Sequence, residues 1–312
     1  MEKNGREIRV MAWVPNPKEV GTLNPSLKAL STSTPPDFLT ICGVTGPTPM
    51  QAGGPSGRIP YCSPQELLQE DFDILLILTG ENGRQKAASI RSTLQGYGLD
   101  PQKYLFDFVA CTPGFSWRKY RKLVKGHVSM LSLNCFAGFL SHSLALRFHT
   151  PTINMFFEEE GFIRMMRHPR IYFEEPLEFD RTEYQETLHF DYPVYRLGDV
   201  FVHMNHYPDF AAAEATWYER VRRINWYNLF VVMFTERPEI AEAFDALPFS
   251  KKVCLVPFRS DLDSAWQIDT KATGTELPLW DAVNHFGAGA PFFYDPFDML
   301  LYGKKTQLVD MP

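Results

Sequence analysis

Short apolar runs recur along the first third of the chain, and amphipathic stretches separate them. Ile8–Val14, Phe38–Val44 and Asp73–Thr79 each have the length of a buried strand, and the last is almost entirely Ile and Leu. Gln85–Tyr97 has helical spacing and is followed by Gly98, a residue type that commonly ends helices. Strands that alternate with helices predict a parallel sheet with right-handed crossovers.

Two further segments belong to this first unit, and a third follows it. Ser63–Glu66 matches a capping box with Pro at the first helical position, which predicts a helix start. Thr45–Pro60 is rich in Pro and Gly and is predicted to be a loop. Arg118–Lys125 contains five basic residues and is predicted to be a connecting helix, whose basic face is either simply solvated or contacts an anionic ligand.

The rest of the chain repeats the alternation. Strands are predicted at Val128–Leu133, Pro151–Phe157, Val200–Met204, Leu229–Phe234 and Val253–Val256, and helices at Phe139–Phe148, Glu158–His168, Asp209–Ile224 and Pro238–Ala246. We therefore expect an α/β protein with two Rossmann-like three-layer domains and mostly parallel sheets. Residues 1–114 form the small domain, and residues 115–312 form the second, which ends in an irregular aromatic segment.

Composition narrows the range of functions. The 312 residues include 31 Lys and Arg against 37 Asp and Glu, and the resulting net charge of −6 argues against a nucleic-acid partner. No apolar run approaches the ~20 residues of a membrane helix, and the polar N-terminus lacks a signal-peptide core. The five cysteines have no CxxC spacing, which indicates reduced thiols and a cytoplasmic protein.

The most suggestive residues for function are Asn134 and Cys135, where a predicted strand ends and a helix is about to begin. Ligands of parallel sheets bind beyond the carboxyl ends of the strands, where free N–H groups favour anions. The same groups are expected to lower the pKa of Cys135 and make it a nucleophile, with Asn134 as a ligand contact. Alternatively, Cys135 is a small packing residue and Asn134 caps the helix.

A second group of polar residues surrounds the strand predicted at Val200–Met204. His206 follows the strand and is a candidate acid/base group or ligand contact, whereas Asp199 precedes the strand and is a candidate ligand residue. His203 and His206 point to opposite faces of a continuous strand, so no metal site is assigned. The alternatives are a buried histidine and an aspartate that anchors a turn.

Arg220 and Arg223 lie three residues apart on one face of a predicted helix, and Asn225 follows them. Two guanidinium groups on one face can bind a phosphate or carboxylate, or they can pair with the many acidic residues of the chain.

The first unit lacks a convincing nucleotide motif. Thr79–Arg84 joins a buried strand to a helix and contains two glycines, but it matches neither the dinucleotide fingerprint nor a P-loop. The cofactor is therefore left unknown, and a nicotinamide-dependent enzyme is disfavoured.

Several blocks between Arg118 and Phe258 resemble a bacterial family of exopolysaccharide-biosynthesis proteins, first catalogued as a domain of unknown function. These blocks are Ser132–Gly138, Pro151–Asn154, Tyr192–Val194, Leu197–Asp199, Asn205–Tyr207, and Trp217 with Arg220, Arg223, Asn225 and Asn228. Leu133, Phe136 and Ala137 depart from the usual Asn-Asn-Cys-Trp-Gly-Gly of that family. The first ~110 residues resemble the Rossmann-like units that accompany sugar-modifying domains.

The resemblance implies a role in surface-polysaccharide assembly and leaves two hypotheses. In the first, the protein is a transferase that acts on an activated sugar or sugar phosphate, with a small anionic sugar or nucleotide-sugar as its ligand. Asn134, Cys135, Asn154 and His206 then form the site, and Arg220 or Arg223 neutralises phosphate. In the second, the protein is a non-catalytic binding or scaffold protein of a polysaccharide-assembly system.

Overall fold

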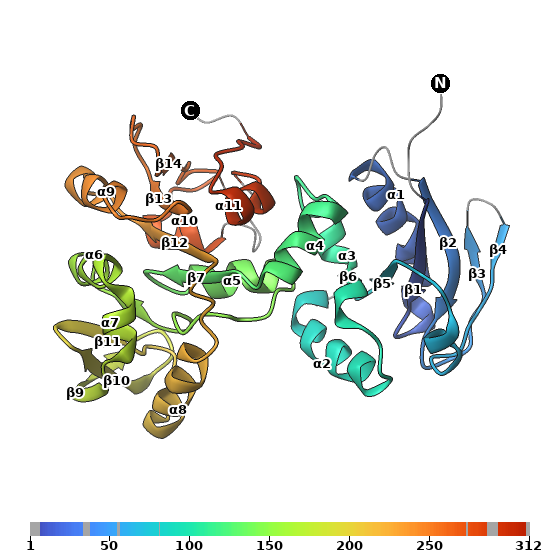
Figure 1. Ribbon diagram of the computed structural model, residues 1–312, viewed down its shortest axis with the longest axis horizontal. Coiled ribbons are helices and arrows are strands. Elements are labelled where there is room, and N and C mark those ends of the chain that lie inside the picture. The colour runs from blue at the N-terminus through green and yellow to red at the C-terminus, as the bar shows by residue number, and fades with distance from the viewer. Residues whose placement is uncertain are drawn as a thin grey trace. The chain divides into compact units, whose positions relative to one another are not determined.

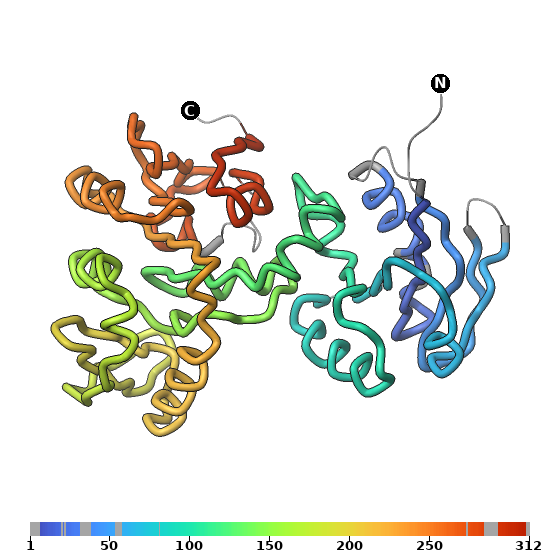
Figure 2. Tube along the Cα trace, in the orientation of Figure 1, coloured from blue at the N-terminus to red at the C-terminus, as the bar shows by residue number. Residues whose placement is uncertain are grey.

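The computed structural model describes residues 7–33, 38–54, 57–80, 82–272, 274–285 and 293–309. The chain folds into two compact units, each traced in Figure 2. Unit 1 comprises Met1–Lys125 with Ser143–Ala145, and unit 2 comprises Gly126–His142 with Leu146–Pro312. The sequence prediction placed the boundary after residue 114, whereas here the basic helix stays with unit 1.

Unit 1 is built on a four-stranded sheet of β1 (Glu7–Trp13), β2 (Phe38–Thr45), β5 (Ile74–Ile77) and β6 (Tyr104–Phe106). All neighbours in the order β2-β1-β5-β6 are parallel. The chain moves from β1 to β2 on one side and then returns to β5 on the other side. This reversal between β1 and β5 is the type of position where α/β sheets form a ligand crevice.

The helices of unit 1 follow these strands (Figure 1). They are η1 (Pro17–Thr22), α1 (Leu23–Ser33), η2 (Glu66–Gln69), α2 (Gly83–Gly96), η3 (Pro101–Lys103), α3 (Asp107–Ala110) and α4 (Trp117–Gly126). The predicted capping box forms, with Ser63 N donating to Glu66 Oε2 at 2.8 Å, yet it opens only the short η2. The predicted loop Thr45–Pro60 contains a small hairpin of β3 (Ala52–Gly54) and β4 (Gly57–Ile59).

Unit 2 contains a second parallel sheet, formed by β7 (Ser129–Ser132), β12 (Leu229–Phe234), β13 (Lys252–Val256) and β14 (Ala265–Gln267). Its order is β14-β13-β12-β7, so the chain crosses this sheet in one direction without reversal. The strands are buried on both faces, as their apolar runs indicated. The prediction of an α/β protein with mostly parallel sheets is confirmed.

The sequence analysis missed an antiparallel sheet in unit 2. It consists of β8 (Phe156–Phe157), β11 (Val200–His203), β10 (Phe190–Leu197) and β9 (Leu177–Gln185), in that order. Much of β9 is solvent-exposed and charged, so it lacks the apolar run on which the prediction relied. Within the strand predicted at Pro151–Phe157, the structure has only the short β8. In the residues just before β8, the side chain of Thr152 accepts a hydrogen bond from Ser132 N of β7.

The helices of unit 2 are α5 (Phe136–Ser143), α6 (Glu159–Arg167), α7 (Pro169–Glu174), α8 (Phe210–Val221), α9 (Pro238–Asp245), α10 (Leu279–His285) and α11 (Pro296–Tyr302). Trp217 of α8 is fully buried in the main core, together with apolar residues of both sheets. Within the described ranges, no helix is long and apolar enough to cross a membrane. Residues 1–6 and 286–292, used above for the signal-peptide and aromatic-segment predictions, lie outside those ranges.

Candidate functional site

Asn134 lies where β7 ends and is almost completely buried. Its Oδ1 accepts a hydrogen bond from Phe136 N at 3.0 Å and so satisfies a free N–H group at the start of α5. This cap is the reason that α5 begins at Phe136 and not at Phe139. Gly138, one turn further, allows close packing because a Cβ there would lie 3.1 Å from Ile153 Cγ2.

Cys135 is half-buried, and its Sγ lies 3.8 Å from the carbonyl oxygen of Met155. Burial raises the pKa of the Cys135 thiol and outweighs the opposing backbone hydrogen bonds of Asn154 and Met155. The expected lowering of this pKa is therefore wrong: desolvation at this strand end is stronger than the field of the N–H groups. The side chain is a neutral thiol at neutral pH.

Arg220 and Tyr207 converge on the segment beside Cys135. Arg220 Nη1 donates to Ile153 O at 3.1 Å and contacts the Tyr207 hydroxyl at 3.0 Å. Burial raises the pKa of Tyr207, and the positive charge of Arg220 opposes this rise. Asn154 follows with φ 63°, a left-handed conformation that asparagine tolerates.

We call Cys135, Asn154, Tyr207 and Arg220 the β7 cluster. The structure thus brings four predicted residues together, because Asn134 adjoins this cluster at Cys135. Tyr207 was not predicted as a site residue. His206 precedes it in the chain and is solvent-accessible, and partial burial of its ring lowers its pKa, which favours the neutral imidazole.

The structure places Asp199 elsewhere. It lies in the turn between β10 and β11, at the end of β11 opposite to His206. The Tyr172 hydroxyl donates to Asp199 Oδ1 at 2.7 Å, and Arg164 Nε lies 2.8 Å from Oδ2. The hydrogen bond from Tyr172 lowers the pKa of Asp199, so this carboxylate has its own charged and polar partners.

Arg223 and Asn225 also lie apart from the β7 cluster. Arg223 pairs with Glu219, one turn earlier on α8. Asn225 Nδ2 donates to the carbonyl oxygens of Gly126 and His127, each at 3.1 Å. Both of those carbonyls precede β7, so Asn225 joins two connections at the amino edge of the sheet.

Glu159 is a candidate that the sequence analysis did not name. It opens α6 and shares a hydrogen bond with Thr235, the residue directly after β12. Burial raises the pKa of Glu159 above its ordinary value of 4.5, while Arg237 opposes that rise. In the sequence it was one of three glutamates at a helix start, which the helix dipole already explained.

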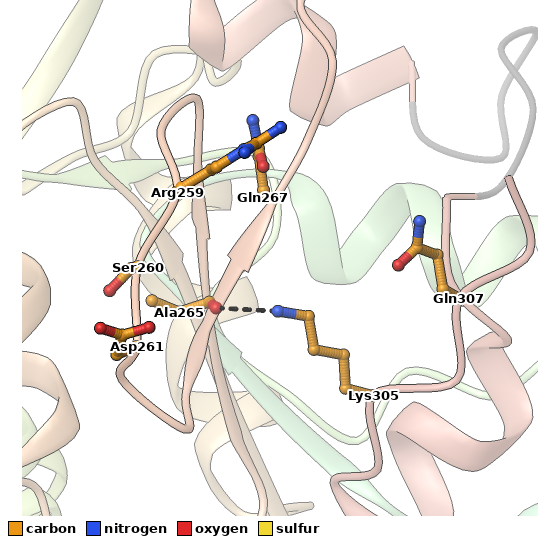
Figure 3. Close-up of a pocket in the computed structure, with 7 residues that line it drawn as sticks. All are labelled: Arg259, Ser260, Asp261, Ala265, Gln267, Lys305 and Gln307. Atoms are coloured by element: carbon orange, nitrogen blue, oxygen red, sulfur yellow. Dashed lines mark hydrogen bonds between the residues drawn. The ribbon is translucent and has the colours of Figure 1, made fainter. Parts of the chain in front are cut away.

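A cavity of about 500 Å³ lies along β14, the edge strand of the parallel sheet, and beside the segment that follows β13 (Figure 3). It is lined by Arg259, Ser260, Asp261, Ala265, Gln267, Lys305 and Gln307. Lys305 Nζ donates to Ala265 O at 3.3 Å, and burial lowers the pKa of Lys305. No local sequence pattern indicates this site, because its two cations lie 46 positions apart in an irregular region. We call it the Arg259–Lys305 cavity.

No group of three or more His, Cys, Asp or Glu side chains in the described part of the chain is arranged to hold a metal ion. The polar groups of the carboxyl edge are suited to anions and hydroxyl groups instead. They comprise two cations and the Asp261 carboxylate in the Arg259–Lys305 cavity, a carboxyl group of raised pKa beside the end of β12, and a thiol with a phenol beside the end of β7.

Comparison with known proteins places the chain in a family. Residues 109–302 match the family described as "Domain of unknown function (DUF1919)". The chain belongs to this family. A relative from Haemophilus influenzae, named as an uncharacterized protein, is 31% identical over 184 residues, which cover 57% of this chain and 84% of the relative. The DUF1919 match includes the β7 cluster and Arg259 but ends before Lys305, and it leaves most of unit 1 outside.

Proposed function

We propose that unit 2 binds an activated sugar or sugar phosphate at the carboxyl edge of its parallel sheet and transfers a group from it. The observation that carries this proposal is the Arg259–Lys305 cavity. It contains the guanidinium group of Arg259, which follows the carboxyl end of β13, the usual ligand side of such sheets. The ammonium group of Lys305 lines the same cavity and contacts Ala265 O, at the start of β14. Arginine and lysine are the side chains that bind phosphate most readily.

The other walls of the cavity carry hydroxyl, amide and carboxylate groups, the last of them from Asp261, and all of these can bind sugar hydroxyl groups. Ser260, Gln267 and Gln307 offer hydroxyl and amide groups, which can donate to and accept from sugar hydroxyls. The cavity volume of about 500 Å³ is within the usual range for a small-molecule site.

The distance along the sheet edge supports an extended ligand. Neighbouring strands lie about 4.8 Å apart, so β14 and β7, three spacings apart, are separated by about 14 Å. A nucleotide-sugar can span that length, with its phosphates at Arg259 and Lys305 and its sugar toward Glu159 and the β7 cluster. Glu159 and His206 are the candidates for proton transfer, because one has a raised and the other a lowered pKa.

The role in polysaccharide assembly rests on the sequence resemblance between Ser132 and Asn228. The second candidate function, a non-catalytic binding or scaffold protein, is favoured by two observations at β7. Cys135 is a neutral thiol, and Asn134 and Arg220 already satisfy backbone groups of this protein. Both functions share the ligand, so binding is tested first.

The binding test is isothermal titration calorimetry of the full chain against UDP-, GDP- and CMP-sugars. Lys305→Met is compared with Lys304→Met, which removes the adjacent charge outside the cavity. We expect at least one ligand to bind, with roughly tenfold weaker affinity in Lys305→Met and little change in Lys304→Met. Equal affinities in both variants, or no binding to any sugar nucleotide, would overturn the proposed site.

The catalytic test follows with the ligand that binds. Release of free nucleotide is measured for the wild type, Glu159→Gln, His206→Ala and Cys135→Ala. Loss of turnover with retained binding in Glu159→Gln or His206→Ala supports the transferase. Binding without nucleotide release in the wild type, whichever acceptor sugar is offered, supports the scaffold function.

A further inference from the structure

Unit 1 has a cavity at the point where its strand order reverses. The cavity measures about 380 Å³ and is lined by Ser26 of α1, Thr79, Gly80, Asn82, Gly83, Arg84, Gln85, Asp107, Phe108 and Cys111. Ser26 belongs to the helix after β1, and Thr79–Gln85 lead from β5 into α2, so the walls come from both sides of the reversal. Glu81, part of the same connection, lies outside the described residues.

The cavity is shaped by a tight turn after β5. Asp107 accepts hydrogen bonds from Thr79 N at 2.9 Å and from Thr79 Oγ1 at 2.6 Å. It also accepts one from Phe108 N at 2.8 Å, so its carboxylate is fully engaged with the protein. Gly83 is required here, because a Cβ would lie 2.0 Å from Thr79 Oγ1.

Arg84 is the cation of this cavity. It is half-buried, and burial alone lowers its pKa. Among the described residues, its guanidinium has no hydrogen bond and no carboxylate partner. Most arginines that lose hydration in a folded protein gain a partner, because desolvation without one is costly. An external anion is the partner that the described residues do not provide.

A second, more apolar cavity adjoins the first. It measures about 560 Å³ and is lined by Pro25, Lys28, Ala29, Ala110, Cys111, Thr112, Gly114 and Phe115. Cys111 is in the walls of both cavities, so the two form one groove with a charged end and an apolar end. The groove lies beside α1 and α3, which contact each other.

We infer that this groove binds a nucleotide, with a phosphate on Arg84 and the base in the apolar cavity beside Phe115. The inference concerns unit 1 and is independent of the function proposed for unit 2. One arginine and no run of glycines fit a single phosphate group better than the pyrophosphate of a dinucleotide. The second cavity, with its mostly apolar walls, leaves room for a larger ligand than inorganic phosphate or a simple sugar phosphate.

Cys111 provides a direct readout, because its thiol is exposed and lies between the two ends of the groove. The full chain is alkylated with N-ethylmaleimide, and modification of each cysteine is followed by peptide mass spectrometry. AMP, GMP, UMP and CMP are tested at millimolar concentration, with adenosine and inorganic phosphate as partial ligands. Cys62, outside the groove, is the internal control.

We expect at least one mononucleotide to slow Cys111 alkylation fivefold or more without affecting Cys62. Arg84→Gln should abolish this protection, whereas Lys86→Gln, which removes an exposed charge on the same helix, should retain it. Unchanged Cys111 alkylation with all four nucleotides would overturn the inference. Full protection by phosphate alone, or protection that survives in Arg84→Gln, would overturn it as well. Sugar-nucleotide binding by unit 2 is measured separately, so either proposal can fail alone.

Discussion

The two parallel sheets of this protein differ in how they use their carboxyl edges. In unit 1 the chain reverses between β1 and β5, and a groove opens at that reversal; its wall contains Arg84, which has no partner among the described residues. In unit 2 the strands follow one another in order from β7 to β14, and no reversal occurs. There the β7 cluster is bonded to the protein itself, and a cavity lies at the far side of the sheet, near Arg259.

The comparison shows that connectivity decides where a strand end is free. Where the strand order reverses, the two connections that follow neighbouring strands run to opposite sides of the sheet. A crevice is therefore left between them at the carboxyl ends of those strands. In an ordered sheet the next connection can cover the previous strand end. In unit 2, the segment Thr150–Met155 covers the carboxyl end of β7 in this way. Arg220 donates a hydrogen bond to the carbonyl oxygen of Ile153 in this segment. A polar residue at a strand end is therefore a ligand contact in one topology and a structural partner in another.

The largest effect is expected from removing the carboxylate that holds the unit 1 groove. Asp107→Ala leaves three donors of Thr79 and Phe108 without their acceptor, which should cost about 3 kcal/mol. Hydrogen-exchange mass spectrometry of unit 1 peptides measures the loss in opening free energy. Asp71→Ala is the matched control, since its carboxylate is 89% exposed and pairs only with Arg9 at the surface. Equal effects in both variants would show that Asp107 does not hold the groove.

The segment that covers β7 should be nearly as sensitive. Thr152 Oγ1 accepts from Ser132 N at 3.0 Å and lies 2.9 Å from Thr150 Oγ1, all in the core. Thr152→Val keeps the shape but leaves those groups unpaired, at a cost of about 2 kcal/mol. Hydrogen exchange of the β7 amides measures this loss of stability. The control is Thr182→Val, on the exposed strand β9. Unchanged protection of β7 would show that this network does not close the edge.

A smaller difference should separate the two arginines of α8. Arg220→Met removes the bonds to Ile153 O and Tyr207 and should cost about 1–2 kcal/mol. Arg223→Met removes only a surface pair with Glu219 and should cost about 0.3 kcal/mol. Thermal unfolding of both variants gives the comparison. A cost for Arg223→Met equal to that for Arg220→Met would contradict the structural role of Arg220.

The smallest effect concerns the pH dependence of Glu159. Burial raises its folded-state pKa above 4.5, so the folded protein binds this proton more tightly than the unfolded chain. Its contribution to stability is therefore lost as the pH rises through that raised value. Glu159→Gln should flatten this fall when urea unfolding is measured between about pH 4 and 7. The hydrogen bond from Arg237 lowers the pKa of Glu239. Glu239→Gln should therefore change the slope of unfolding free energy against pH in the opposite direction.

Much of the fold was predictable because its signals are local. The apolar runs of β1, β5 and β12 and the glycine after α2 predicted those elements with small shifts at their ends. The antiparallel sheet was not predictable in this way. β9 mixes charged and aromatic residues on its exposed positions, and its pairing with β10 depends on a partner that local periodicity does not reveal.

The candidate site was predictable only in part. The sequence placed Asn134 and Cys135 at a strand end, which the structure has, and the motif blocks included Arg220. The sequence could not show that Asn225 lies at the amino edge of the parallel sheet. It also could not show that Arg259 and Lys305 line the same cavity. The direction of the Cys135 pKa shift was also undecided by the sequence, since burial and N–H groups oppose each other there.

The sequence by itself thus determined the α/β class, the alternation of strands and helices, and the residues that follow each parallel strand. These properties depend on neighbours within a few positions of one another. The tertiary structure decided which strand ends are covered, which cations line a cavity and which polar groups lie close together. Those properties depend on strand order and burial, because a side chain's free energy is set by whatever distant segment removes its water.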